Sequence, residues 1–79
     1  MTVQILGGGC PKCHQLEKNA REAISRLGVE ADVEKVTDMD RIVEMGVMVT
    51  PALALDGVVK KTGSVLSADQ IVEILKAEE

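Results

Sequence analysis

The Cys-x-x-Cys motif, Cys10-Pro11-Lys12-Cys13, constrains this chain most, because it stands where a short apolar strand gives way to an amphipathic helix. Residues 3–6 are mainly apolar and precede three glycines, which is typical of a buried central strand that enters a loop. Pro11 suits the first turn of a helix and Gly28 suits its end. Between them the apolar residues recur with a helical period: Leu16, Ala20, Ala23, Ile24 and Leu27. We therefore predict a strand over residues 3–6 and a helix over residues 11–27.

This arrangement places Cys10 at the N-cap of the helix, immediately before Pro11. A sulfur at an N-cap faces unpaired backbone N–H groups and the positive end of the helix dipole, which favour thiolate over thiol. Cys10 is therefore the expected nucleophile, and Lys12 adds a positive charge nearby. Cys13 lies one turn later on the apolar face, within reach of Cys10, and is the expected resolving cysteine. We expect the three glycines at 7–9 to leave the Cys10 sulfur uncrowded for a protein-sized partner.

The middle of the chain predicts a second strand and a short second helix. Residues 29–34 alternate apolar and charged side chains, as expected for an edge strand with one solvated face. A strand, a helix and a strand in this order imply a right-handed parallel crossover. Thr37 or Asp38 can cap a short helix that contains Ile42 and that Gly46 ends.

The last part of the chain predicts a hairpin and a final helix. Asp56-Gly57 separates two apolar runs, over residues 52–55 and 58–61, and this pair suits the positive φ angles of a type I′ turn. Ser67 and Gln70 have the spacing of a capping box before the last apolar helical stretch. The predicted order is βαβαββα: an α/β fold with a four-stranded mixed sheet flanked by helices, in a single domain over residues 1–79.

Composition narrows the function further. The chain of 79 residues contains no Trp, Tyr or Phe and has a net charge of −4, which argues against base stacking and against phosphate binding. No apolar run approaches the ~20 residues of a membrane span, and the N-terminus lacks the pattern of a signal peptide. We expect a cytoplasmic monomer that binds neither nucleic acid nor membrane. In a reducing compartment, two close cysteines are more often catalytic or metal-binding than a permanent crosslink.

Several features then occur together in one order: a strand, Cys-Pro-Lys-Cys at a helix start, Thr50-Pro51 ahead of a hairpin, and Gly63-Ser64 before the last helix. In this combination the chain resembles the thioredoxin superfamily in its minimal, glutaredoxin-sized form, over essentially its full length. It is most similar to small archaeal and bacterial thioredoxin-like redox-active disulfide proteins. The resemblance implies a minimal thioredoxin fold and a protein-disulfide oxidoreductase activity.

The resemblance also implies roles for individual residues. Cys10 matches the attacking cysteine and Cys13 the resolving one, and Pro51 matches the superfamily's cis-proline. The Thr50 backbone would then pair with substrate, and Gly63 matches a glycine that clears space beside the proline. The expected substrate-binding residues are Gly9, Lys12, Thr50, Pro51 and Gly63.

The same resemblance implies partners for the chain, and two positions differ from the usual thioredoxin pattern. It implies protein disulfides as substrates, a dithiol or flavin-dependent reductase as electron donor, and no bound cofactor. Thioredoxins usually carry Trp just before the first cysteine, where this chain has Gly9. They also carry a buried Asp that assists the resolving thiol, whereas this chain has Gln4 six residues before Cys10.

Metal carriage is the alternative function, because two thiolates can hold Cu(I) or share a zinc ion. A structural zinc site normally needs four ligands, and the cysteine pair with His14 supplies three at most. The run from Cys10 to His14 also matches the C-x-x-C-H haem attachment pattern. Haem needs a large pocket with some aromatic lining, and His14 falls on the solvated side of the predicted helix. Thiol–disulfide exchange therefore ranks first.

Overall fold

Strand β1 (Thr2–Leu6) lies at the centre of the sheet in the computed structural model, which describes residues 1–78. It pairs in parallel with β2 (Asp32–Val36) and antiparallel with β3 (Ala52–Leu55). β3 in turn pairs antiparallel with β4 (Val58–Thr62), so the strand order is β2-β1-β3-β4. The predicted βαβαββα order and mixed four-stranded sheet are confirmed. The last residue of the expected domain, 79, lies outside the described residues.

Helix α1 (Pro11–Leu27) begins and ends where the sequence predicts. Cys10 is its N-cap, with extended backbone angles, and Pro11 occupies the first helical position. Gly28 has a φ of 67° and donates its N–H to the carbonyl of Ile24 at 3.0 Å, which closes the helix.

The predicted bounds of the second strand are wrong by several residues. The alternation over residues 29–34 suggested a strand there, but β2 covers Asp32–Val36. Its position is set by pairing with β1, which runs in register from Thr2 opposite Asp32 to Leu6 opposite Val36. The prediction of a parallel edge strand is confirmed.

Local signals fix the remaining elements. Asp38 caps α2 (Met39–Glu44), because its side chain accepts a hydrogen bond from the N–H of Asp40 at 2.9 Å. Asp56 and Gly57 have φ angles of 49° and 86°, as a type I′ hairpin turn requires. Helix α3 (Ala68–Ala77) begins at a complete capping box formed by Ser67 and Gln70.

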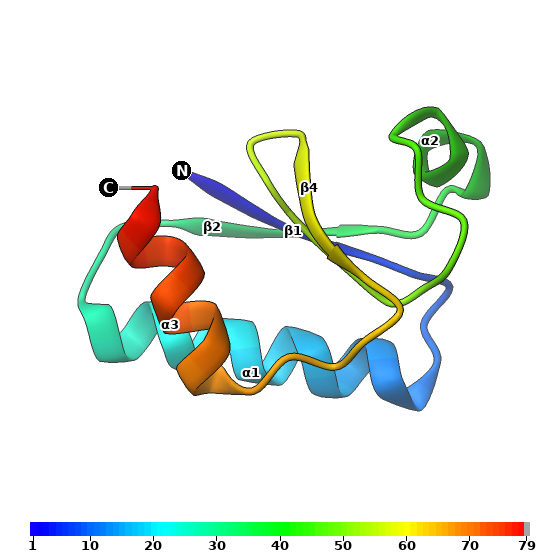
Figure 1. Ribbon diagram of the computed structural model, residues 1–79. Helices are drawn as coiled ribbons and strands as arrows, with labels where there is room; N and C mark the ends of the chain where they lie inside the picture. Colours follow the sequence, from blue (N-terminus) through cyan, green and yellow to red (C-terminus); the bar gives the residue numbers. More distant parts are fainter. Residues whose placement is uncertain (79) are drawn as a thin grey trace.

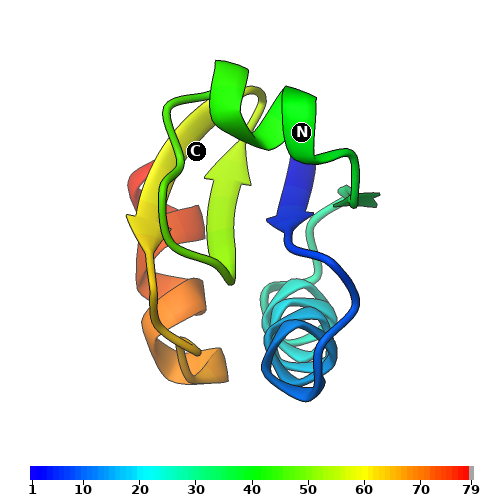
Figure 2. The same ribbon diagram turned by 90° about the vertical axis from the view of Figure 1, so that its right-hand side faces the viewer.

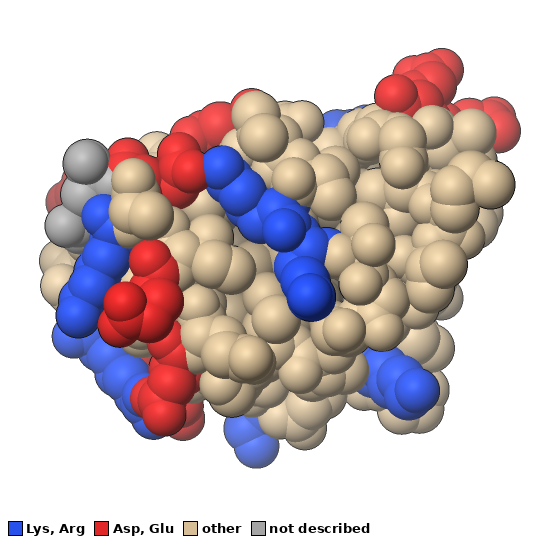
Figure 3. All heavy atoms as spheres, viewed as in Figure 1, with Lys and Arg blue, Asp and Glu red and all other residues tan. Residues whose placement is uncertain are grey.

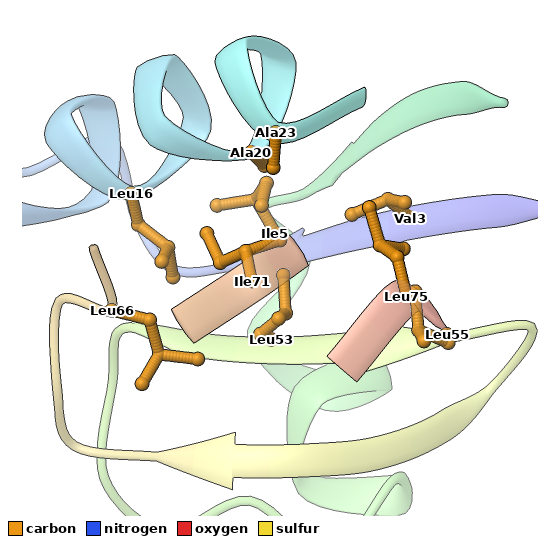
Figure 4. Packing of buried hydrophobic residues seen from close by; sticks show 10 residues of the cluster. All are labelled: Val3, Ile5, Leu16, Ala20, Ala23, Leu53, Leu55, Leu66, Ile71 and Leu75. Atoms are coloured by element: carbon orange, nitrogen blue, oxygen red, sulfur yellow. The ribbon is translucent and has the colours of Figure 1, made fainter. Parts of the chain in front are cut away.

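Helices cover both faces of the sheet. α1 and α3 lie against one face and α2 lies over the other, at the end where the chain leaves β1 for α1 (Figures 1 and 2). The larger core cluster lies between the sheet and the helices α1 and α3 (Figure 4). A smaller cluster lies beneath α2. Its buried residues are Leu6, Val36, Ile42, Val47, Ala52 and Ala54.

Candidate active site

The two cysteines meet at the N-terminus of α1. Their Sγ atoms lie 2.7 Å apart, and the backbone N–H of Cys13 donates to the Cys10 Sγ at 3.4 Å. Cys10 is exposed, whereas Cys13 is 5% exposed and lies on the face of α1 that packs against the sheet. One sulfur is therefore open to a partner and the other is shielded directly behind it.

The surroundings of the two thiols shift their pKa values in opposite directions. The pKa of Cys10 is lowered from 9.0, first by the hydrogen bond from the Cys13 thiol and then by the Cys13 backbone N–H. The backbone N–H of Lys12 acts in the same direction. Burial raises the pKa of Cys13 from 9.0, and its hydrogen bond with Cys10 adds to this effect. Deprotonation of the pair therefore begins at Cys10, the exposed sulfur.

The three glycines have different surroundings. Gly7 is buried, and a Cβ built on it would overlap the Sγ of Cys13. Gly8 has open space at the same position, and Gly9 has a φ of 84° that side-chain-bearing residues rarely adopt. From the sequence we expected all three glycines to leave space around Cys10. Only the structure reveals that Gly7 makes room for the buried sulfur.

The loop before β3 lies beside Gly7 in space. A Cβ on Gly7 would lie 3.8 Å from the Cβ of Thr50, so Thr50 lies beside the cysteine loop. The Thr50-Pro51 peptide bond is cis, with Thr50 exposed and Pro51 buried. The Gly63 N–H donates to the Pro51 carbonyl at 2.9 Å. This hydrogen bond holds the segment after β4 against the loop before β3.

Two further expected residues belong to the helix start itself. Gly9 helps to line a hollow beside Cys13, whereas Lys12 is exposed in the first turn of α1. The structure therefore brings Gly9 and Thr50 close to the cysteine pair and holds Pro51 and Gly63 together. Lys12 acts on Cys10 through its backbone N–H.

We did not predict from the sequence that polar side chains of His14, Glu17, Lys35 and Thr37 lie around one hollow. Glu17 follows Cys13 by four residues, a spacing that puts both on one side of α1 and was readable from the sequence. Lys35 comes from β2, and no sequence signal linked it to this site.

Gln4 does not face the cysteine pair. Its neighbours Val3 and Ile5 join the core under α1, so Gln4 points to the opposite face of the sheet. There its Nε2 donates to Glu34 at 2.8 Å, and its Oε1 accepts from the N–H of Gly57 at 2.7 Å. Gln4 thus ties together β1, β2 and the hairpin turn.

The surface beside the pair is apolar. Met48 is 89% exposed and Val49 is 57% exposed, both just before Thr50. Figure 3 shows acidic side chains gathered at the upper right, over α2, above a largely uncharged surface. Exposed apolar side chains therefore precede Thr50, which lies beside the cysteine loop.

Residues 1–78 contain neither a metal-binding cluster nor a helix that could cross a membrane. Within this part of the chain, no group of three or more His, Cys, Asp or Glu residues is arranged to hold a metal ion. None of the helices described is both long enough and apolar enough to span a membrane.

Comparison with known proteins agrees with this geometry. A family model described as "Thioredoxin domain" matches residues 1–76. A thioredoxin of Methanothermobacter thermautotrophicus is 49% identical over 75 residues, which cover 95% of this chain and 97% of that protein. A thioredoxin of Methanocaldococcus jannaschii is 42% identical over 77 residues, which cover 98% of this chain and 88% of that protein. With its adjacent Cys10 and Cys13, the chain is a thiol–disulfide oxidoreductase that belongs to the thioredoxin domain family.

Proposed function

We propose that the chain is a protein-disulfide reductase in which Cys10 is the nucleophile and Cys13 the resolving cysteine. One observation carries this assignment: an exposed sulfur at the N-cap of α1 lies 2.7 Å from a buried one. The lowered pKa of Cys10 and the raised pKa of Cys13 support the same division of roles. The thiolate is the attacking species in thiol–disulfide exchange, so the exposed thiol with the lower pKa reacts first.

The cycle transfers two electrons from the dithiol to the substrate. The Cys10 thiolate attacks one sulfur of a substrate disulfide, that S–S bond breaks, and the departing thiolate takes a proton from solvent. Cys13 then loses its proton and attacks the Cys10 sulfur, which forms the Cys10–Cys13 disulfide and releases the second substrate thiol. A dithiol or flavin-dependent reductase returns two electrons and restores the pair. The cycle needs no bound cofactor.

Protein disulfides are the proposed substrate class. The apolar surface at Met48 and Val49 can pack against a protein chain, and the Cys10 side chain is exposed. Thr50, Pro51 and Gly63 are the proposed substrate contacts on the neighbouring loop, and Gly9 and Lys12 those on the cysteine loop. The Methanothermobacter and Methanocaldococcus relatives are themselves named thioredoxins.

We further propose that residues 1–79 form one domain that works as a monomer in the cytoplasm. The radius of gyration of 11.3 Å supports the single domain, because about 12 Å is expected for a compact unit of this length. A reducing compartment keeps the pair available as a dithiol.

A trapping experiment tests the roles of the two cysteines. Cys13→Ser should accumulate a mixed disulfide between Cys10 and a model protein substrate, whereas Cys10→Ser should trap nothing. In the reduced wild type, alkylation counted by mass should modify Cys10 at lower pH than Cys13, because a lowered pKa gives thiolate at lower pH.

Two outcomes would contradict the proposal. The first is trapping by Cys10→Ser but not by Cys13→Ser, which would reverse the roles. The second is a wild-type protein that forms no Cys10–Cys13 disulfide in a redox titration and instead retains stoichiometric metal, which would establish the carrier function.

A further inference from the structure

A small hollow of about 40 Å³ lies directly beside Cys13. Its walls come from the end of β1, the first turns of α1 and the end of β2. The polar side chains among its lining residues belong to Cys13, His14, Glu17, Lys35 and Thr37. The volume is enough for a water molecule, which needs roughly 10–15 Å³ of such space together with two to four polar partners.

Glu17 is the carboxylate of this hollow, and its side chain is only 16% exposed. Arg21, one turn further along α1, donates to Glu17 Oε2 through Nε at 3.0 Å, and its Nη2 lies 2.9 Å from the same oxygen. Lys35 on β2 places its Nζ 3.6 Å from Glu17 Oε1. Two cations from two elements thus fix the carboxylate on the same side of α1 as Cys13.

The charges around Glu17 keep it ionised. Its pKa is lowered, first by the hydrogen bond from Arg21 and further by the charge of Lys35. Cys13 and His14 are the other titratable groups that line the hollow. Its remaining neighbours on this side, Ile5 of β1 and Gly7 of the loop that follows, carry no charge. In the neutral pH range Glu17 is therefore an acceptor of hydrogen bonds and not a donor.

The resolving step needs such an acceptor. Cys13 is buried with a raised pKa, so it is a thiol when the mixed disulfide forms and must lose its proton before it can attack. Its sulfur is screened from bulk solvent, and Gln4 lies on the other face of the sheet. The hollow lies next to the thiol, and Glu17 is the carboxylate among its lining residues.

We propose that Glu17 is a positioning residue for the resolving step: its carboxylate holds a water in the hollow that takes the proton of Cys13. This inference rests on the proposed role of Cys13. The S–H bond of Cys13 breaks, its proton passes to the water and on to solvent, and its electron pair forms the bond to the Cys10 sulfur. The bond between Cys10 and the substrate breaks, and the departing substrate thiolate takes a proton from solvent.

Glu17 is a better candidate for this task than His14. His14 is exposed, one residue beyond Cys13, whereas Glu17 lies four residues along α1 on the same side as Cys13 and is largely buried. Two cations also hold the Glu17 carboxylate in place.

A chromogenic aromatic disulfide, dithiobis(nitrobenzoate), separates the two steps. Attack by Cys10 releases one coloured thiolate, and attack by Cys13 on the resulting mixed disulfide releases the second. Below the pKa of Cys13, Glu17→Gln should slow the second phase about tenfold, less than the usual effect of a general base because bulk water can partly substitute. The first phase should be unchanged.

Glu22→Gln is the matched control, because it removes the same charge from a 55%-exposed carboxylate of α1 that pairs with Arg26. It should leave both phases unchanged. Three responses would separate a proton-transfer role from a structural one. The Glu17→Gln defect should vanish at pH values above the Cys13 pKa, added imidazole buffer should reduce it, and Glu17→Asp should recover part of the rate. Far-UV circular dichroism checks that each variant is folded.

The proposal is overturned if a folded Glu17→Gln keeps the wild-type second phase, or if its defect is the same at every pH. It is also overturned if His14→Gln, and not Glu17→Gln, slows that phase. Failure of the proposed function looks different, because a second phase that persists in Cys13→Ser would remove Cys13 from the resolving role altogether.

Discussion

Cys10 and Cys13 show how position alone gives two identical side chains different chemistry. Both lie at the start of one helix, but Cys10 precedes the helix as its N-cap, whereas Cys13 lies in its first turn and is buried. Hydrogen bonds from Cys13 lower the pKa of Cys10, whereas burial raises the pKa of Cys13. The same contact between the sulfurs therefore stabilises one thiolate and the protonated form of the other.

Gly7 is the residue whose replacement should separate packing from loop flexibility. Its Cα faces the Cys13 sulfur so closely that a methyl group there would overlap it. Gly7→Ala should therefore lower the free energy of unfolding of the reduced protein by about 1–3 kcal/mol, the usual effect of overpacking a buried position. It should also slow closure of the Cys10–Cys13 disulfide, because the resolving sulfur is displaced.

Gly8→Ala provides the control, because the space beside Gly8 is open and its φ is not positive. Its effect should stay within about 0.5 kcal/mol. Urea unfolding followed by far-UV circular dichroism is the suitable measurement, since the chain has no Trp, Tyr or Phe to report by fluorescence. Equal losses in both variants would show that loop flexibility and not the Cys13 contact is what these glycines supply.

Much of the cysteine geometry could be predicted from sequence because it is local. The N-cap position of Cys10 and the burial of Cys13 follow from Pro11 and the helical period, and both are observed. The contacts of Gly7 and Lys35 could not be predicted in this way. The contact of Gly7 with the Cys13 sulfur depends on how the loop after β1 folds over the start of α1. The contact of Lys35 with Glu17 depends on how β2 packs beside α1.

At the scale of elements, the capping box stabilises the start of α3, a helix that contributes Ile71 and Leu75 to the core. Ser67 accepts from the Gln70 N–H at 3.2 Å, and Gln70 Oε1 accepts from the Ser67 N–H at 2.9 Å. Ser67→Ala should lower the free energy of unfolding by about 1 kcal/mol, because it leaves an N–H at the helix start without its acceptor. Ser25→Ala, at an exposed position inside α1, should cost nothing, since alanine is the better helix former. A similar loss in both variants, measured by urea unfolding, would contradict this role of the cap.

The elements that were predicted well are those that carry their own signals. The bounds of α1 follow from Pro11 and Gly28, and the hairpin follows from Asp56-Gly57. The strand β2 has no comparable signal, and its bounds were missed because pairing with β1 decides them. The alternating pattern identified an edge strand correctly but not where the pairing starts.

At the scale of the whole molecule, the sheet has two open edges, β2 and β4, and both carry charged residues. On β2, Glu34 lies 3.6 Å from Arg41 and Lys35 lies 3.6 Å from Glu17. On β4, Lys60 forms an ion pair with Glu78. Charged side chains along an edge disfavour pairing with a strand of another molecule, because the pairing would bury them or place like charges together.

We therefore expect the reduced protein to be a monomer over a wide range of concentrations. Light scattering after size-exclusion chromatography, with a reductant present to prevent disulfides through Cys10, should give a mass near 8.4 kDa. Lys61→Val tests whether the charged edge prevents association. Lys61 is exposed on β4, and its replacement makes this edge, which already carries the exposed Val58, more apolar. This variant should self-associate as concentration rises, whereas Lys18→Val, which removes an exposed charge from α1, should not. A wild-type dimer under these conditions would mean that the charged edges do not keep the molecules apart.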